Sequence, residues 1–151
     1  MRLTLQTDYA LRVLTFVGTK PAGRATIQEI VDGFGISRGH VMKVAYQLGR
    51  KGYLETVRGK GGGLRLAREP RSIAVGEVIR DMEDLDVVGC LPDRKGYCRI
   101  ERCCVLRGAL REAARAFATA LDRYTLADLL APRTQLAELL GLAAPAVAAP
   151  S

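Results

Sequence analysis

The chain of 151 residues is 48% apolar and carries a formal net charge of +7. This length fits one domain, or a small domain with an appendage, and the chain lacks the run of about 18 apolar residues that a membrane span needs. The charged and polar first residues exclude a secretory signal peptide. We therefore expect a cytoplasmic protein without a membrane partner, whose thiols are kept reduced.

The positive charge is concentrated in the first half of the sequence. Residues 1–71 hold 13 Lys and Arg against 5 Asp and Glu, a net of +8, whereas residues 72–151 hold 10 against 11, a net of −1. A basic half joined to a nearly neutral half indicates a module that binds a polyanion, beside a part with another role. A solvated basic surface would give the same charge, so the order of the elements has to decide.

A helix is predicted close to the N-terminus. Residues 4–18 carry apolar side chains at three- and four-residue steps, which give the helix one buried stripe. Asp8 lies near the start of this helix, where a carboxylate interacts favourably with the helix dipole. The proline and glycine in residues 20–23 then end the helix.

The next 30 residues predict a helix-turn-helix unit. Thr26 begins a capping box and a short helix that runs to about Phe34. Gly35 opens a tight turn, and Ser37 is a good N-cap for a second helix at residues 38–50. Two short helices joined by a glycine turn are typical of this unit, although generic helical hairpins share the outline.

Two short strands with a glycine-rich loop between them follow directly. Residues 53–57 and 64–67 have the composition of strands, and the loop of residues 58–63 holds four glycines together with Arg58 and Lys60. Glycine lets the backbone approach another surface closely. A nucleotide-phosphate loop would lead into a helix, whereas these glycines lead into a strand. We therefore interpret the hairpin as a DNA-binding wing.

The helix-turn-helix and the wing together predict binding to double-stranded DNA. The helix at residues 38–50 fits the major groove, where base edges are distinguishable, and Arg38 is the best candidate for reading a guanine. The wing would reach the neighbouring minor groove or the phosphates. For His40, a plain surface or capping role is the alternative. The candidate DNA-binding residues are Ser37, Arg38, His40, Lys43, Arg58, Lys60, Gly61, Gly62 and Arg65.

All four cysteines lie within fifteen residues of a polar loop, at Cys90, Cys98, Cys103 and Cys104. Thiols that serve only for packing would be spread over apolar positions, so this clustering points to ligands. Seven residues separate Cys90 from Cys98, and five separate Cys98 from Cys104. These gaps exceed those of paired zinc-binding cysteines and suit a cluster held by three thiolates and another residue. A zinc site, a disulfide and incidental thiols are the alternatives.

A long amphipathic helix follows the cysteines. Residues 73–82 outline a helix that docks on the core, and residues 104–124 outline one of about 20 residues, which spans about 30 Å. A domain of about 70 residues is too small to cover it. Pairing with the same helix of a second chain would give a two-fold homodimer, which suits a palindromic operator. Thr125 caps a last short helix, which ends before Pro132.

We expect a mainly α fold with a small β wing, divided into three parts. Residues 1–80 would form a winged helix-turn-helix DNA-binding domain, and residues 81–131 the cysteine loop and dimerisation helix. Residues 132–151 would be a disordered tail with one helical segment at 136–142. An enzyme is poorly supported, because the chain has a single histidine and no Cys-x-x-Cys, nucleophile elbow or nucleotide loop.

Several stretches resemble the bacterial winged-helix iron–sulfur transcriptional regulators. They are TDYALR at residues 7–12, the turn and helix around residues 37–43, VRGKGGGLRL at residues 57–66, the loop cysteines, and YTLADL at residues 124–129. The resemblance spans about residues 1–131 and is greatest to the nitric-oxide-sensing repressors. Members that respond to iron, or that regulate iron–sulfur biogenesis, share much of the pattern.

The resemblance implies a homodimeric repressor that carries one iron–sulfur cluster per subunit. In the nitric-oxide sensors this is a 4Fe-4S cluster, with 2Fe-2S as the alternative, and nitric oxide destroys it and releases the DNA. By position, the ligands would be Cys90, Cys98 and Cys104, with Asp8 of the partner subunit as the fourth. The first gap is longer than usual in the family and Cys103 is extra, so Cys103 is the alternative to Cys104. Sensing of iron status and a thiol–disulfide switch are the alternative functions.

Overall fold

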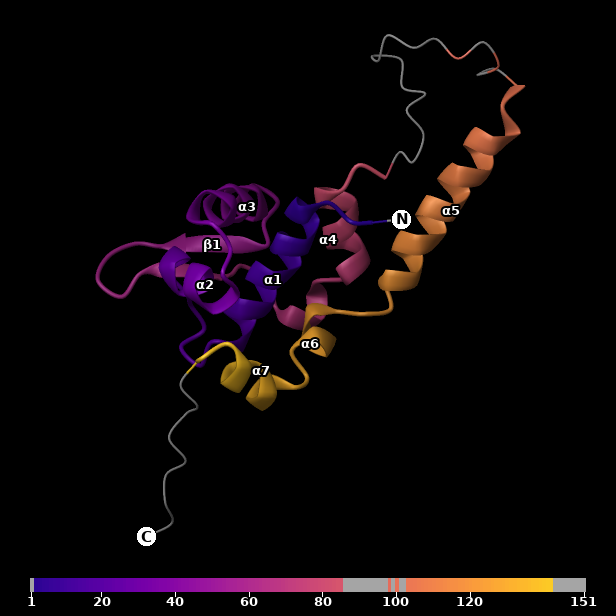
Figure 1. Ribbon diagram of the computed structural model, residues 1–151. Helices are drawn as coiled ribbons and strands as arrows, with labels where there is room; N and C mark the ends of the chain where they lie inside the picture. Colours follow the sequence, from indigo (N-terminus) through magenta and orange to yellow (C-terminus); the bar gives the residue numbers. More distant parts are fainter. Residues whose placement is uncertain (1, 86–97, 99, 101–102, 143–151) are drawn as a thin grey trace.

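Helices form most of the chain, and the one sheet has two antiparallel strands. The computed structural model describes residues 2–85, 98, 100 and 103–142, and it confirms the expected fold class. Figure 1 shows α1 at the centre of a rounded body, from which α5 projects to one side. Within the described residues, no helix is both long and apolar enough to cross a membrane.

Helix α1 (Leu5–Thr19) provides the centre of the hydrophobic core. Its N-cap Thr4 accepts a hydrogen bond from the backbone N–H of Thr7, and Asp8 lies in the first turn, as predicted. The helix packs against α3, α4 and the second strand. Four members of the predicted apolar stripe are buried, namely Ala10, Val13, Leu14 and Val17, and Phe16 is buried beside them. Leu5, at the start of the predicted stripe, is 58% exposed.

The helix-turn-helix unit forms as the sequence predicts. Helix α2 (Ile27–Phe34) begins with a complete capping box at Thr26, and it ends at Gly35, whose φ of 64° lies in the left-handed region that glycine adopts without strain. Ser37 is the N-cap of helix α3 (Arg38–Arg50). The sequence placed these ends correctly because each is marked by a residue with a specific capping role.

The two strands of the wing are β1 (Leu54–Val57), which starts one residue later than predicted, and β2 (Gly63–Leu66), which starts and ends one residue earlier than predicted. They pair with Leu54 opposite Leu66. An isolated bridge joins the sheet to the segment before α2: Ala25 N–H donates to the carbonyl of Leu64 at 2.9 Å, and Leu64 N–H donates back at 2.7 Å. The wing is thus fastened to the helix-turn-helix.

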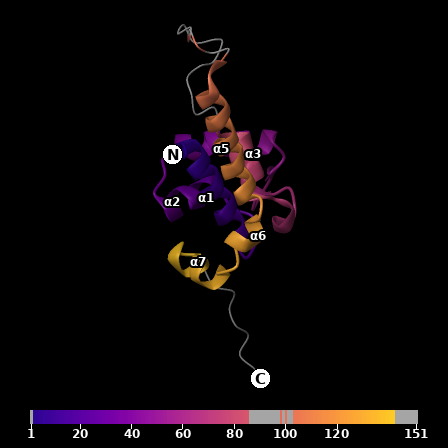
Figure 2. The same cartoon turned by 90° about the vertical axis from the view of Figure 1, so that its right-hand side faces the viewer.

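Helix α5 (Val105–Leu121) leaves the body of the molecule along its own axis. After the short 3-10 helix η1 (Pro70–Ser72), helix α4 (Val75–Met82) packs against the end of α5. Two hydrogen bonds of 3.0 and 2.7 Å join the Arg80 guanidinium to the Asp122 carboxylate. Figure 2, a side view, shows the first turns of α5 rising above the body. The helix ends three residues before its predicted end at 124.

The chain beyond α5 is more ordered than expected. Helix α6 (Leu126–Leu129) starts at Thr125 with a capping box, as predicted. Helix α7 (Arg133–Leu139) starts three residues earlier than the expected segment, because proline is tolerated at a helix start. Ala137 and Leu142 are buried in the core cluster. Residues 132–142 therefore do not match the disorder expected of the tail, and residues 143–151 lie outside the described part.

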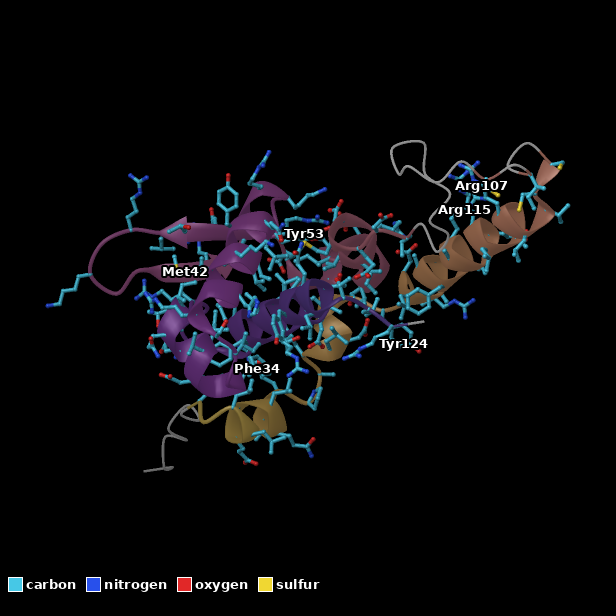
Figure 3. All side chains as sticks on the ribbon, turned by 45° about the horizontal axis from the view of Figure 1, so that its top comes forward. Phe34, Met42, Tyr53, Arg107, Arg115 and Tyr124 are labelled. Atoms are coloured by element: carbon cyan, nitrogen blue, oxygen red, sulfur yellow. The ribbon has the colours of Figure 1, made fainter. Side chains whose placement is uncertain are left out.

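A buried tyrosine joins the root of the wing to α4. Tyr53 is fully buried, its hydroxyl donates to Asp81 at 2.7 Å, and Lys51 donates to the other carboxylate oxygen at 3.1 Å. Burial, and then the hydrogen bond to Asp81, raise the pKa of Tyr53 well above its ordinary value. Burial raises the pKa of Asp81, but the hydrogen bonds from Tyr53 and Lys51 lower it by more. In Figure 3, Tyr53 lies where α3 faces α4.

We expect Tyr53→Phe to lower the free energy of unfolding at pH 7 by about 1–2 kcal/mol, because the hydrogen bond from a buried hydroxyl to a half-buried carboxylate is lost. The depressed pKa of Asp81 contributes stability above its unfolded value of about 4, and this contribution is lost as the pH falls through the folded value. Urea unfolding measured between pH 7 and pH 3 should therefore show that the free energies of unfolding of Tyr53→Phe and wild type become more similar below about pH 4.

The matched control is Tyr46→Phe, because Tyr46 is 66% exposed on α3. This variant should stay within about 0.5 kcal/mol of wild type at every pH. Equal losses in the two variants would show that the Tyr53–Asp81 bond does not stabilise the fold.

Candidate DNA-binding surface and cluster ligands

The first turn of α3 is fixed by its own cap. The Ser37 hydroxyl accepts a hydrogen bond from the backbone N–H of His40 and lies 2.8 Å from the Nδ1 atom of the same residue. On its other side, the His40 ring stands 5.7 Å from the ring of Tyr9 on α1. Ser37 and His40 are therefore local positioning residues at the start of the candidate recognition helix, and both are exposed.

Arg38, the predicted base-reading residue, is held by a partner that the sequence did not reveal. Its Nη1 atom donates to the side-chain oxygen of Gln28 on α2 at 3.1 Å. Gln28 and Arg38 are ten residues apart, and only the packing of α2 on α3 brings them together. Lys43 lies five residues farther along α3 and is exposed, so both basic residues are available to a ligand.

The tip of the wing is an exposed basic loop on a tight backbone. Arg58 and Lys60 are both exposed. Gly61 has a φ of 74°, which favours glycine. A side chain at Gly62 would bring its Cβ to 2.3 Å from the carbonyl oxygen of Val57. Two of the predicted glycines are thus required by the backbone, and they place the two cations at the end of the hairpin.

Arg65 differs from the two wing-tip cations. It lies in β2 directly opposite Glu55 of β1, and its Nε atom is 2.5 Å from the Glu55 carboxylate. The structure therefore places Arg65 in a neutral cross-strand pair, although the sequence grouped it with the DNA-binding residues.

A cavity of about 630 Å³ lies between the start of α1 and α3. Arg2 and Lys43 bring positive charge to its wall from the two elements. Sequence reasoning missed Arg2, because nothing in the first residues shows that they lie beside the recognition helix. The lining residues are Arg2, Leu3, Thr4, Leu5, Gln6, Tyr9, His40, Lys43 and Val44.

Asp8 lies on the exposed side of the first turn of α1, where Arg12 is its partner at 2.8 Å. A second carboxylate, missed from the sequence, holds the same turn. Glu83, the C-cap of α4, accepts hydrogen bonds from the backbone N–H of Thr4 at 3.1 Å and from the hydroxyls of Thr4 and Thr7. The turn that carries Asp8 is thus tied to the residue that ends α4.

Three of the four cysteines fall within the described residues, and all three are free thiols. Cys98 and Cys104 are half-buried, whereas Cys103 is exposed and its Sγ donates to the carbonyl of Ile100 at 3.5 Å. Cys104 is the N-cap of α5. Cys90 lies outside the described residues. Among those that are described, no three Cys, His, Asp or Glu side chains converge to hold a metal ion.

Comparison with known proteins identifies the class of this chain. Residues 3–132 match the Rrf2 family, described as an iron-dependent transcriptional regulator. The chain belongs to the Rrf2 family. It is 44% identical to the HTH-type transcriptional regulator NsrR of Bacillus subtilis over 142 residues, which cover 93% of this chain and 97% of the relative. The NsrR of Bacillus licheniformis is 43% identical over 93% of this chain and 99% of its own length.

Solved structures agree on the fold. IscR of T. potens superposes with a TM-score of 0.67 at 26% identity, over 86% of each chain. CymR of B. subtilis, described as the global cysteine regulator, superposes with a TM-score of 0.60 at 24% identity, over 85% of this chain and 95% of its own. The match to the Rrf2 family and the NsrR relatives, together with the helix-turn-helix and the wing, show a DNA-binding transcriptional regulator and not an enzyme.

In this Rrf2-family chain, the start of α5 exposes an apolar surface. Val105 is 84% exposed and Leu106 63% exposed, and Ile100 just before the helix is 58% exposed. Farther along the helix, Ala114 and Ala118 are buried. Figure 3 shows Arg107 and Arg115 on the projecting part of the helix. Large apolar side chains at such exposure are typical of a surface that another chain covers.

Proposed function

We propose that this chain is a homodimeric repressor whose iron–sulfur cluster, of the 4Fe-4S type and one per subunit, senses nitric oxide and controls binding to a palindromic operator. The observation that carries the proposal is the set of free thiols at the start of α5, in a chain that is 44% identical to a regulator named NsrR. Nitric oxide is proposed as the signal because the sequence resembles the nitric-oxide-sensing members of the family.

The proposed ligands are Cys90, Cys98 and Cys104, with Asp8 of the partner subunit as the fourth. Thiolates are the usual ligands of such a cluster, whose iron reacts with nitric oxide. Two features of the described residues support this choice. Cys104 caps α5 and is half-buried, whereas Cys103 is exposed and bonded to a backbone carbonyl. The Asp8 carboxylate is 41% exposed and is therefore accessible to another chain.

The proposed dimer would form along α5. The first turns of this helix lie away from the body in both ribbon views, and they carry the exposed Val105 and Leu106. Pairing two copies of the helix would remove this apolar surface from water and would place two DNA-binding domains symmetrically. The division into a domain of residues 1–80 and a cluster and dimerisation unit of residues 81–131 is part of this proposal.

The proposed docking on DNA uses α3 and the wing. Helix α3 would enter the major groove with Arg38 toward the bases, and Ser37, His40 and Lys43 beside it. Arg58 and Lys60, with the backbone at Gly61 and Gly62, would reach the adjacent phosphates or minor groove. The exposure of both wing cations supports this role. Arg65 would contribute less charge than the sequence suggests, because Glu55 is its partner.

Lys60→Ala should weaken binding to all DNA sequences alike and should reduce the slope of log affinity against log salt by about 0.9, which is the loss of one phosphate contact. The matched control removes the neutral pair with Glu55→Ala and Arg65→Ala together, and it should leave the slope nearly unchanged. Fluorescence anisotropy at several salt concentrations measures both. A larger change in the control than in Lys60→Ala would contradict this docking.

Cys90→Ala, Cys98→Ala and Cys104→Ala should each give a protein without the visible absorption of a cluster, whereas Cys103→Ala should keep it. The physical reason is that Cys104 is the half-buried N-cap of α5, whereas the Cys103 thiol is exposed and donates to the carbonyl of Ile100. Absorption spectra and iron and sulfide contents of anaerobically purified proteins test this. A colourless Cys103→Ala beside a coloured Cys104→Ala would reverse the assignment.

Asp8→Ala should keep a cluster but change its circular dichroism and its rate of reaction with nitric oxide, because a hard oxygen ligand is replaced by a more labile one. Asp8→Cys should react more slowly than wild type. If Asp8 serves only the helix dipole and Arg12, Asp8→Ala should lose about 0.3–1 kcal/mol of stability, with unchanged spectra and rates. Glu138→Ala on α7 is the control for removal of an exposed carboxylate.

The second candidate function is a thiol–disulfide switch without metal, which the exposed free thiol of Cys103 favours. The two proposals differ in colour: the purified anaerobic protein should be brown in the first case and colourless in the second. Titration with nitric oxide should abolish operator binding in the first case. If only iron limitation abolished it, the regulator would sense iron status.

A further inference from the structure

We propose that Gln28, on the first helix of the helix-turn-helix, determines sequence specificity by holding Arg38 in the orientation that reads a base. This inference rests on the DNA docking proposed above and assigns a role to a residue outside the recognition helix. Its starting point is the hydrogen bond of 3.1 Å from Arg38 Nη1 to Gln28 Oε1, which links the start of α3 to the first turn of α2.

The Gln28 amide has a defined orientation of its own. Its Nε2 atom donates to Asp32 Oδ1 at 2.8 Å, one turn farther along α2. Because the nitrogen faces the carboxylate, the oxygen faces Arg38. A flipped amide would place two donor groups against each other and a carbonyl against a carboxylate. Asp32, Gln28 and Arg38 therefore form a directional chain of hydrogen bonds, which starts from a residue anchored in a helix.

These two hydrogen bonds leave free the N–H groups of Arg38 that would read a base. The bond to Gln28 uses one N–H of Nη1, so the parallel N–H groups of Nε and Nη2 stay free to act as a fork. The N7 and O6 atoms of guanine in the major groove accept such a fork. An arginine that is oriented before binding loses less conformational entropy on the DNA. The hydrogen bond from Arg38 to Gln28 should therefore raise the affinity for DNA that carries the correct base.

The position of the pair fits this role. Gln28 and Arg38 line a hollow of about 530 Å³ whose other wall is the glycine backbone of the wing, from Gly59 to Gly63. The Arg38 guanidinium therefore lies on the side of the recognition helix that faces the wing, where the DNA would pass from one to the other. Gln28, Arg38 and Asp32 are all exposed, so the chain serves no packing purpose in the core.

The test starts from the full-length protein purified anaerobically. Selection from a randomised DNA pool defines the sequence that wild type prefers, and the specificity ratio is its affinity relative to a scrambled duplex. Gln28→Ala should lower this ratio about 2- to 10-fold, the effect expected from one hydrogen bond, while binding to the scrambled duplex stays the same. Alanine favours the helix, so folding is preserved; circular dichroism confirms it.

Three further variants make the result specific. In an Arg38→Ala background, Gln28→Ala should change nothing more, because the residue that it holds is gone. Gln28→Leu, which keeps the size of the side chain but lacks the amide oxygen, should lower the ratio as Gln28→Ala does. Gln135→Ala, an exposed glutamine on α7, should behave as wild type.

Other outcomes overturn the inference in distinguishable ways. An unchanged ratio in Gln28→Ala, or an equal drop with and without Arg38, would show that Gln28 does not act through Arg38. Equal weakening on both duplexes would make Gln28 a direct phosphate contact instead. A wild-type protein without any preferred sequence would remove the proposed function as well as this inference.

Discussion

Burial of one stripe of α1 is the interaction on which the rest of the structure depends. Ala10, Val13 and Leu14 have no exposed surface, and burial of each larger apolar side chain contributes about 1.5–3 kcal/mol. Since α1 packs against both α3 and α4, it is the common wall of the reading element and of the support for α5. Its first turn carries Asp8 and is bonded to Glu83. A change at that turn would act on a helix that cannot move without disturbing the core.

The support for α5 combines the buried Ala114 and Ala118 with a polar pair, whereas the support for α3 is apolar. Arg80 and Asp122 join α4 to the end of α5 through two hydrogen bonds, and Gly76 lets the two helices approach until a Cβ would lie 2.3 Å from a backbone carbonyl of Ala118. Surface ion pairs are weak individually. Here the close backbone contact between α4 and α5 fixes the positions of Arg80 and Asp122 relative to each other. Among the described residues, these contacts hold the last turns of α5 to the body, while the exposed Val105 and Leu106 lie on its first turn.

The features that could be predicted from the sequence are those set by single residues with a local role. Thr26, Gly35 and Ser37 mark helix ends through caps and a left-handed φ, so the helix-turn-helix was located correctly. Partners far apart in the chain, such as Gln28 with Arg38 or Glu83 with Thr4, depend on packing and carry no signal in one sequence. The pairing of Arg65 with Glu55 was missed for the same reason. The helix in the tail was predicted at 136–142 and lies at Arg133–Leu139, and the burial of Ala137 and Leu142 against the core likewise depends on packing.

The bridge between Ala25 and Leu64 has a consequence for how a signal could reach DNA. Because it fastens the wing to the start of α2, the recognition helix and the wing form one rigid DNA-binding unit. The distance between the two parts of this unit that would contact DNA is therefore fixed. Bending the wing away from the helix would break two short backbone hydrogen bonds and leave their groups unpaired. Control of binding in a dimer would then change the distance and the angle between the two DNA-binding units, while each unit keeps its own shape.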